Sequence, residues 1–275
     1  DSLLFYQHMN VGTAKPSAEE LADVPHHLIN VVPPSQQYSI GEYLKSVKSV
    51  VEAIHSRGKC VLVVGGSGFY LNAFFAPVVD GLALDPVEEA RIRDLFENQA
   101  LETSVEELLR LNPDGLGDLD VNNPRRVFRA WLRCVAADKT LREIKSDFQD
   151  RPGEFHAYEK QLLVLSRPRE ELEYRVGLRV DQMLSDGLIE EVRQLLELGI
   201  EENASAAGSI GYRETIAFLK GEISESDLAE TISRNTRKLL KKQRTWFKKY
   251  LPQEAVLDVS VLEALPDAWC HVPAK

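Results

Sequence analysis

Helical and strand-like patterns of apolar residues alternate along the first part of this chain. Residues 41–57 carry apolar side chains at helical spacing, and Gly58 follows them as a stop signal. Residues 60–64 form an uninterrupted apolar run that ends in Gly65-Gly66-Ser67-Gly68. That profile predicts a buried parallel strand, a tight turn and a helix that begins near Phe69. Helix, strand, glycine-rich turn and helix in this order predict an α/β fold.

The pattern changes over residues 79–158. Strand-like runs are absent there, and helical segments alternate with breaks such as Asn-Pro and Pro-Asp-Gly, which predicts a helical insertion. The apolar run 161–166 then predicts a return to a buried strand. The predicted domains are therefore an α/β core, residues 1–78 and 159–275, and a helical insertion, residues 79–158.

Further elements are predicted on both sides of the insertion. The burst Leu3–Tyr6 has the pattern of a strand end, and residues 255–259 have that of a weak strand. Three long helices are predicted over 168–186, 187–198 and 225–250.

Charge adds a local basic surface to an acidic protein. The net charge of the 275 residues is −10, which disfavours a general nucleic-acid coat. One segment nevertheless holds eight basic residues and no acid: Arg234, Arg237, Lys238, Lys241, Lys242, Arg244, Lys248 and Lys249. Because Trp246 and Phe247 lie inside it, the segment suits contact with an RNA backbone and base stacking. A solvated helix face with core-facing aromatics is the alternative.

Composition excludes several other classes of protein. No stretch approaches the roughly 18 apolar residues that span a bilayer, and the chain does not open on a signal-peptide pattern. The three cysteines lie far apart without a CxxC pair, which indicates neither a disulfide framework nor a zinc site. We therefore expect a cytoplasmic protein with reduced thiols and no membrane contact.

Four polar groups are candidates for chemistry. Asp1, at an expected strand end, could accept a proton or simply cap a turn. Ser67 lies in a glycine-rich turn that could bind an anion or be an ordinary strand-to-helix connection. Arg126, Arg129 and Arg133 share one helix face, which suits either phosphate or surface ion pairs. Arg175 and Arg179 are one helical turn apart beside apolar residues, so they should need a protein carboxylate or a ligand phosphate.

Together these segments resemble the tRNA dimethylallyltransferases, also called tRNA isopentenyltransferases. The match follows the family's order along almost the whole chain. Asp1-Ser2 with Gly12-Thr13-Ala14-Lys15-Pro16 is similar to its DS and GTAKP motifs, and Val24 to Ile29 is its VPHHLI. The other matching segments are Gly65 to Leu71, Asn122 to Ala130, residues 174–192, Ile210 to Glu214 with Leu219 to Ser224, Arg234 to Arg237, and Lys242 to Phe247.

The resemblance implies a P-loop-NTPase-like parallel sheet core with a helical insertion, and a reaction. In this reaction the N6 amine of adenine 37 in tRNA attacks dimethylallyl diphosphate, and diphosphate leaves with the help of Mg²⁺. The target base must be extruded from the anticodon loop. By resemblance, Asp1 is the general base, Ser67 supplies a hydroxyl at the reacting centre, and Arg175 and Arg179 bind the diphosphate.

The resemblance also implies a monomer that binds the tRNA anticodon stem-loop through four segments. The helical insertion would contribute one of them. Their residues are Asp1, Ser2, Leu3 and Leu4; Arg125, Arg126, Val127, Phe128 and Arg129; Gly208, Ser209, Ile210, Gly211, Tyr212 and Arg213; and Lys241, Lys242, Gln243, Arg244, Thr245, Trp246, Phe247 and Lys248.

This sequence departs from the family pattern in several places. It opens at Asp1, so the family's first strand and phosphate-binding P-loop are expected to be missing, and turnover by this chain is expected to suffer. Leu4 stands where the family has a Gln that recognises adenine, and Ser67 replaces a Thr. A truncated family member, a catalytically impaired tRNA-binding paralogue and an adenylate isopentenyltransferase that acts on free nucleotides are the alternatives. The basic segment and the insertion disfavour the last.

Overall fold

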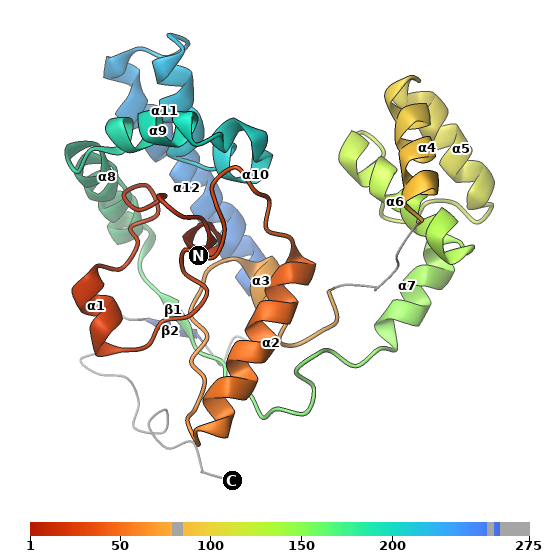
Figure 1. Cartoon of the computed structure of the whole chain (residues 1–275), viewed down its shortest axis with the longest axis horizontal. Helices are drawn as coiled ribbons and strands as arrows, with labels where there is room; N and C mark the ends of the chain where they lie inside the picture. Colours follow the sequence, from red (N-terminus) through yellow and green to blue (C-terminus); the bar gives the residue numbers. More distant parts are fainter. Residues whose placement is uncertain (79–84, 252–255, 259–275) are drawn as a thin grey trace. The chain divides into compact units, whose positions relative to one another are not determined.

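The computed structural model describes residues 1–78, 85–251 and 256–258, and the chain divides into two compact units (Figure 1). The first, here the core unit, comprises the described residues of Asp1–Asn72 and Ala157–Lys275. The second, here the helical unit, is Ala73–His156. The predicted insertion of residues 79–158 overlaps most of the helical unit, but residue 79 itself lies outside the described residues.

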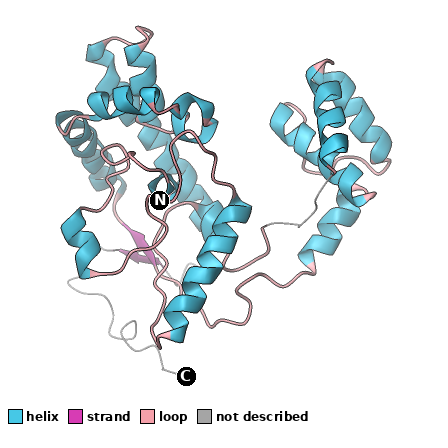
Figure 2. Ribbon diagram, viewed as in Figure 1, coloured by secondary structure: helices cyan, strands magenta, loops and turns pink. Residues whose placement is uncertain are grey.

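Helices make up most of both units (Figure 2). Those of the core unit are η1 (Ser2–Phe5), α1 (Ala18–Asp23), α2 (Ile40–Ser56), α3 (Gly68–Asn72), α8 (Arg169–Ser185), α9 (Leu188–Glu197), η2 (Ile200–Glu202), α10 (Ala204–Ala207), α11 (Tyr212–Leu219) and α12 (Glu225–Tyr250). Those of the helical unit are α4 (Pro86–Glu97), α5 (Leu101–Leu111), α6 (Pro124–Ala137) and α7 (Leu141–Gln149).

The long helices predicted from periodicity are confirmed, and local signals explain their ends. The Ser39 hydroxyl and the Glu42 carboxylate form a reciprocal capping box at the start of α2. Gly187, at a φ of 95°, separates α8 from α9, a conformation that glycine adopts without a Cβ penalty. Helix α12 covers the predicted 225–250, and Pro252, the predicted stop, lies outside the described residues.

Strands are few in the described part of the chain. β1 (Val164–Ser166) pairs in parallel with β2 (Val256–Asp258), with Val164 opposite Val256. The only other pairing there is an isolated parallel bridge between Tyr6 and Val32. The strands predicted at 161–166 and 255–259 are confirmed in shortened form, and residues 255 and 259 lie outside the described residues.

Two strand predictions are wrong. Residues 60–64 form no strand, and Leu62 and Val64 are 69% and 79% exposed. A strand exists through its hydrogen-bonded ladder, and this apolar run has no pairing partner among the described residues. The burst Leu3–Tyr6 is mainly the short helix η1, because the Asp1 carboxylate caps it by accepting the Leu3 N–H. Of the parallel sheet core expected from sequence, the described residues therefore contain the two-stranded β1–β2 sheet.

The helical unit has a hydrophobic core of its own. Its buried members are Ile92, Leu108, Val127, Ala130, Trp131, Leu132, Cys134 and Ile144. Asn112 closes one end of this core, because its amide donates to the Leu108 carbonyl (2.8 Å) and accepts from the Leu141 N–H (2.6 Å). Burial raises the pKa of the nearby Cys134 thiol, which keeps it an apolar core group.

In the core unit, α12 packs against α8, α11 and α3, and α9 packs against α11. Leu188, Val192 and Leu195 of α9 and Leu228 and Ile232 of α12 are almost completely buried. Among the described helices, none has both the length and the apolarity that crossing a membrane requires.

Candidate functional site

Aromatic packing brings the Asp1 segment and the glycine-rich turn together. Phe5 at the end of η1 contacts Tyr70 of α3, with ring centroids 5.6 Å apart, and Tyr43 of α2 meets Tyr70 edge-on at 5.0 Å. Figure 1 shows α3 beside the N-terminal segment. Burial raises the pKa of Tyr43 to about 12, so its hydroxyl stays neutral within this cluster. The short helices η1 and α3, which adjoin the two predicted catalytic residues Asp1 and Ser67, are therefore neighbours.

The Asp1 carboxylate is exposed. One of its oxygens accepts the Leu3 N–H at 3.0 Å. Asp1 therefore caps η1, the role that the sequence offered as an alternative to catalysis. It does not consume the carboxylate, because a carboxylate has about four lone-pair sites. The group can still accept a proton from a ligand.

Helix α12 holds the turn that carries Ser67. The Gln243 amide on α12 donates a hydrogen bond to the Gly66 carbonyl (2.7 Å). A Cβ added to Gly68 would lie 2.3 Å from the Trp246 ring, far inside van der Waals contact. The sequence pattern suggested that these glycines let a ligand approach the backbone. The structure shows that they let α12 approach it.

Arg175 and Arg179 are exposed on α8, rather than held against the core as predicted. Among the described residues, neither has an ion-pair or hydrogen-bond partner. The protein carboxylate that was one of the two predicted partners of Arg175 and Arg179 is therefore not found among the described residues. Two unpaired guanidinium groups one helical turn apart can bind an anionic ligand through forked hydrogen bonds.

The outer face of α12 is basic. Lys241, Lys242 and Arg244 are exposed and form no ion pair within the described residues, whereas Arg237 pairs with Glu230 (3.1 Å). Thr245 is exposed too, but its hydroxyl bonds to the Lys241 carbonyl of the same helix. This face offers unpaired positive charge to a polyanion.

The inner part of the same segment serves packing. Trp246 and Phe247 are half-buried, with ring centroids 5.7 Å apart, and the Trp246 ring also contacts the tilted Tyr250 ring at 5.0 Å. The two alternatives for this segment, basic RNA surface and core-facing aromatics, therefore apply to different faces of one helix.

A third part of the core unit is a loop, residues 9–15, that Glu191 of α9 fixes in place. The Glu191 carboxylate accepts the backbone N–H groups of Asn10 (2.8 Å), Val11 (2.7 Å) and Gly12 (3.2 Å) and the Tyr212 hydroxyl (2.7 Å). Burial, followed by the negative charge of Glu191, raises the pKa of Tyr212, so its hydroxyl remains a donor. Sequence analysis missed this role of Glu191, although the residue lies inside one of the matching segments.

Lys15 ends this loop and ties it to the neighbouring strand-like segments. Its ammonium group donates to the Tyr6 carbonyl (2.8 Å) and to the Asn30 side-chain oxygen (2.6 Å). Burial lowers the pKa of Lys15 to about 8, and the charge of Glu191 opposes that change. The motif Gly12 to Pro16 is thus a structural anchor in this arrangement.

The predicted segment Gly208 to Arg213 is divided between surface and core. Tyr212 is completely buried, and its ring fills the space where a Cβ on Gly12 would lie, 2.6 Å away. Arg213 is exposed and pairs with the buried carboxylate of Glu214, which also accepts the Gly211 N–H (2.8 Å). Asn235 of α12 donates to the same carboxylate (2.7 Å). Glu214, another residue the sequence analysis missed, therefore orients this segment.

The last predicted segment belongs to the helical unit, at the start of α6. Arg125, Arg126 and Arg129 are exposed there. Val127 is completely buried in the core of this unit, and Arg93 of α4 covers the Phe128 ring at 5.0 Å. The arginine side chains of this segment can reach a ligand, whereas the Val127 side chain cannot.

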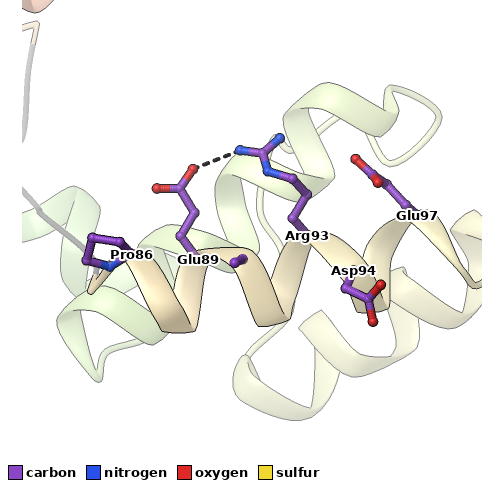
Figure 3. Close-up of a pocket in the computed structure, with 6 residues that line it drawn as sticks. Pro86, Glu89, Arg93, Asp94 and Glu97 are labelled. Carbon is purple, nitrogen blue, oxygen red and sulfur yellow. Dashed lines mark hydrogen bonds and ion pairs between the residues drawn. The ribbon is translucent and has the colours of Figure 1, made fainter.

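A shallow hollow of about 300 Å³ lies along one face of α4 (Figure 3). It is lined by Pro86, Glu89, Ala90, Arg93, Asp94 and Glu97, and Glu89 pairs with Arg93 at 2.8 Å. Three carboxylates against one guanidinium make this hollow repel phosphate groups. It is therefore not the site of a phosphorylated ligand.

The family model described as IPP transferase matches residues 4–250. The chain belongs to the IPP transferase family. A tRNA dimethylallyltransferase of Opitutus terrae is 47% identical over 262 residues, 95% of this chain and 84% of that protein. A tRNA dimethylallyltransferase 1 of Trichlorobacter lovleyi is 34% identical over 250 residues, 90% of this chain and 80% of that protein.

Solved structures of IPP transferase relatives share the fold. The tRNA isopentenylpyrophosphate transferase of Staphylococcus epidermidis matches with a TM-score of 0.63 at 29% identity, over 96% of this chain and 84% of that one. A eukaryotic dimethylallyltransferase acting on tRNA matches with a TM-score of 0.77 at 27% identity, over 94% of this chain and 66% of that one. The predicted family resemblance is thereby confirmed.

Proposed function

We propose that this member of the IPP transferase family transfers a dimethylallyl group from dimethylallyl diphosphate to N6 of adenine 37 in tRNA. One observation carries the proposal. Phe5–Tyr70 packing and the Gln243–Gly66 hydrogen bond join the Asp1 segment, the Ser67 turn and the basic helix α12 in one unit. A base, a hydroxyl and an RNA-binding surface are the parts that this reaction needs. Relatives named tRNA dimethylallyltransferase support the transfer of this group to tRNA.

The chemical step follows from the groups available. The N6 lone pair forms a bond to the terminal allylic carbon, and the C–O bond to diphosphate breaks with its electron pair on the leaving oxygen. The Asp1 carboxylate takes the proton from N6 as the new bond forms. Ser67 donates a hydrogen bond at the reacting centre, and Arg175 and Arg179 stabilise the charge that develops on diphosphate.

Mg²⁺ is part of the proposal. Among the described residues, no group of three or more His, Cys, Asp or Glu side chains could form a metal cage. Mg²⁺ does not require such a cage, because it is usually bound by one or two carboxylates together with substrate phosphates. Bound in that way, the ion would neutralise charge on the leaving diphosphate, and Asp1 is the carboxylate of the candidate site that could hold it.

The tRNA would be held through its phosphates and its extruded base. Lys241, Lys242 and Arg244 on α12 and Arg125 and Arg126 on α6 are exposed donors for phosphate. Adenine 37 must leave its stack to present N6. We retain a P-loop-NTPase-like core, action as a monomer and a cytoplasmic location as predictions that belong to this proposal.

Nucleoside analysis of a tRNA anticodon stem-loop tests the proposal. The stem-loop is incubated with dimethylallyl diphosphate, Mg²⁺ and the chain, alone or joined at its N-terminus to the phosphate loop of a relative. We expect prenylated adenosine, and a loss of about 10²-fold or more in kcat for Asp1→Asn. Asp23→Asn, an exposed aspartate at the end of α1, is the matched control and should retain the activity. Stem-loop binding without product from either form of the chain would indicate an RNA-binding protein instead.

A further inference from the structure

The turn that carries Ser67 is held mainly by residues far away in the sequence. Within the turn and α3 the Ser67 carbonyl accepts the Leu71 N–H (3.0 Å), and α3 is only five residues long. The preceding residues 60–64 pair with no strand in the described part of the chain. A short helix after an unpaired segment has little local stability of its own. Something else must fix the position of the Ser67 hydroxyl.

Helix α12 supplies two contacts to this turn, one on each side of Ser67. The Gln243 amide donates to the Gly66 carbonyl at 2.7 Å, and the contact is partly buried. The Trp246 ring lies against Gly68, closely enough that an added Cβ would come within 2.6 Å of three of its atoms. Gln243 and Trp246 are three positions apart, so both project from one face of α12.

We infer that Gln243 and Trp246 are positioning residues that hold the Ser67 turn for prenyl transfer. This inference rests on the proposed function. Sequence analysis assigned both residues to tRNA contact, yet the Gln243 Nε2 group is committed to Gly66. The contacts of Gln243 and Trp246 with this turn are to Gly66 and Gly68. They act through the backbone on either side of Ser67.

The arrangement gives α12 two faces with different tasks. Its exposed face carries Lys241, Lys242 and Arg244, and its other face carries the residues that hold the turn. Loss of a basic residue should therefore weaken RNA binding, whereas loss of Gln243 should slow the chemical step. An interaction that matters only for the alignment of the reacting groups lowers kcat without raising the Kd for RNA.

Kinetics of Gln243→Met test this division. Met has a similar volume and lacks the amide donor, so it removes the hydrogen bond while retaining the packing. We expect kcat to fall about tenfold, the change that follows from losing roughly 1.4 kcal/mol of hydrogen bonding, with less than a twofold change in the Kd for the stem-loop. Gln194→Met, at an exposed glutamine on α9, is the matched control and should change neither. A raised Kd with unchanged kcat would assign Gln243 to RNA contact and overturn the inference.

Hydrogen exchange gives a second readout that does not require activity. The Leu71 amide, which bonds to the Ser67 carbonyl, should exchange at least fivefold faster in Gln243→Met than in the unaltered chain. Amides of α9, which belongs to the same unit as Gln243 and Leu71, should not change, which shows that the core unit of the variant is folded. Absence of prenyl transfer by the unaltered protein would contradict the proposed function alone, because the exchange experiment still tests the contact. Equal Leu71 exchange in both proteins would overturn the positioning role.

Discussion

At the scale of single residues, the half-buried carboxylate of Glu191 and the buried carboxylate of Glu214 organise the core unit. Glu191 accepts three backbone N–H groups of the 9–15 loop and the Tyr212 hydroxyl, and Glu214 accepts Gly211, Arg213 and Asn235. A carboxylate that is withdrawn from water is costly unless it accepts hydrogen bonds, and both of these carboxylates accept several. They stabilise the loops that surround the candidate site.

Substitution of Glu191 by Gln should destabilise the protein markedly. Gln places an NH₂ group where a carboxylate oxygen now accepts donors, so at least one charge-assisted hydrogen bond is lost and two donors oppose each other. We expect the free energy of unfolding in urea to fall by about 2–4 kcal/mol.

Glu190→Gln is the matched control for this substitution. Glu190 is the preceding residue on α9, and its exposed carboxylate lies 3.9 Å from Arg193. Exposed ion pairs contribute little, so the change should be within about 0.5 kcal/mol. Equal effects of the two substitutions would contradict the role of Glu191.

Lys15 should react with acylating reagents at lower pH than other lysines. Burial lowers its pKa to about 8, so a large fraction of the amine is neutral and nucleophilic at pH 8.5. Mass spectrometry after brief acetylation should show more modification at Lys15 than at Lys139, although Lys139 is more exposed. The hydrogen bond from Lys139 to Asp147 raises the pKa of Lys139, which keeps it protonated. Faster modification of Lys139 at this pH would refute the prediction.

At the scale of secondary-structure elements, α12 connects most parts of the candidate site. Its N-terminal half packs through Leu228 and Ile232, and Asn235 donates a hydrogen bond to Glu214 of α11. Gln243 and Trp246 contact the glycine-rich turn. The opposite face remains basic and exposed. A helix of 26 residues is long enough, at about 1.5 Å per residue, to link sites that lie far apart.

Two glycine-to-alanine substitutions should have opposite effects on stability. In Gly68→Ala the new methyl group would overlap the Trp246 ring, so α12 and α3 must separate, and we expect a loss of about 1–3 kcal/mol. Gly177 lies in the middle of α8, and nothing is within 4 Å of an added Cβ. Gly177→Ala should therefore stabilise by about 0.5–1 kcal/mol through helix propensity. Thermal unfolding of both variants checks the contrast.

At the scale of the whole molecule, the chain is built from two units with separate cores. The helical unit surrounds Ile92, Leu108 and Val127 with four helices, and the core unit surrounds the interface of α8, α9, α11 and α12. A unit whose apolar residues are buried among themselves can fold alone.

We expect a fragment of residues 73–156 to fold without the rest of the chain. Circular dichroism should show a helical spectrum and a cooperative thermal transition. Leu108→Asp is the control, because it buries a charge in the centre of this core and should abolish the transition. A fragment that unfolds without cooperativity would mean that the helical unit depends on the core unit.

Much of the architecture could be predicted from the sequence. Helices α2, α8, α9 and α12 follow from apolar spacing and from stop signals such as Gly58 and Gly187, since these depend on residues within one or two turns. The family also follows from sequence, because its motifs occur in order over most of the chain. The same motifs identified the candidate site residues Asp1, Ser67 and Arg175 and the basic residues of α12.

Tertiary structure alone decided how these parts are used. The apolar run 60–64 had the composition of a buried strand, but a strand needs a partner that composition does not provide. The purpose of Gly66 and Gly68 depended on Gln243 and Trp246, more than 170 positions away. The sequence also did not determine which aromatic and basic residues of α12 face the core and which face solvent, because that depends on the elements that pack against the helix. Local sequence determines local geometry. The role of a residue such as Gly66 or Gln243 depends on contacts between segments that are distant in the chain, and only the tertiary structure shows these.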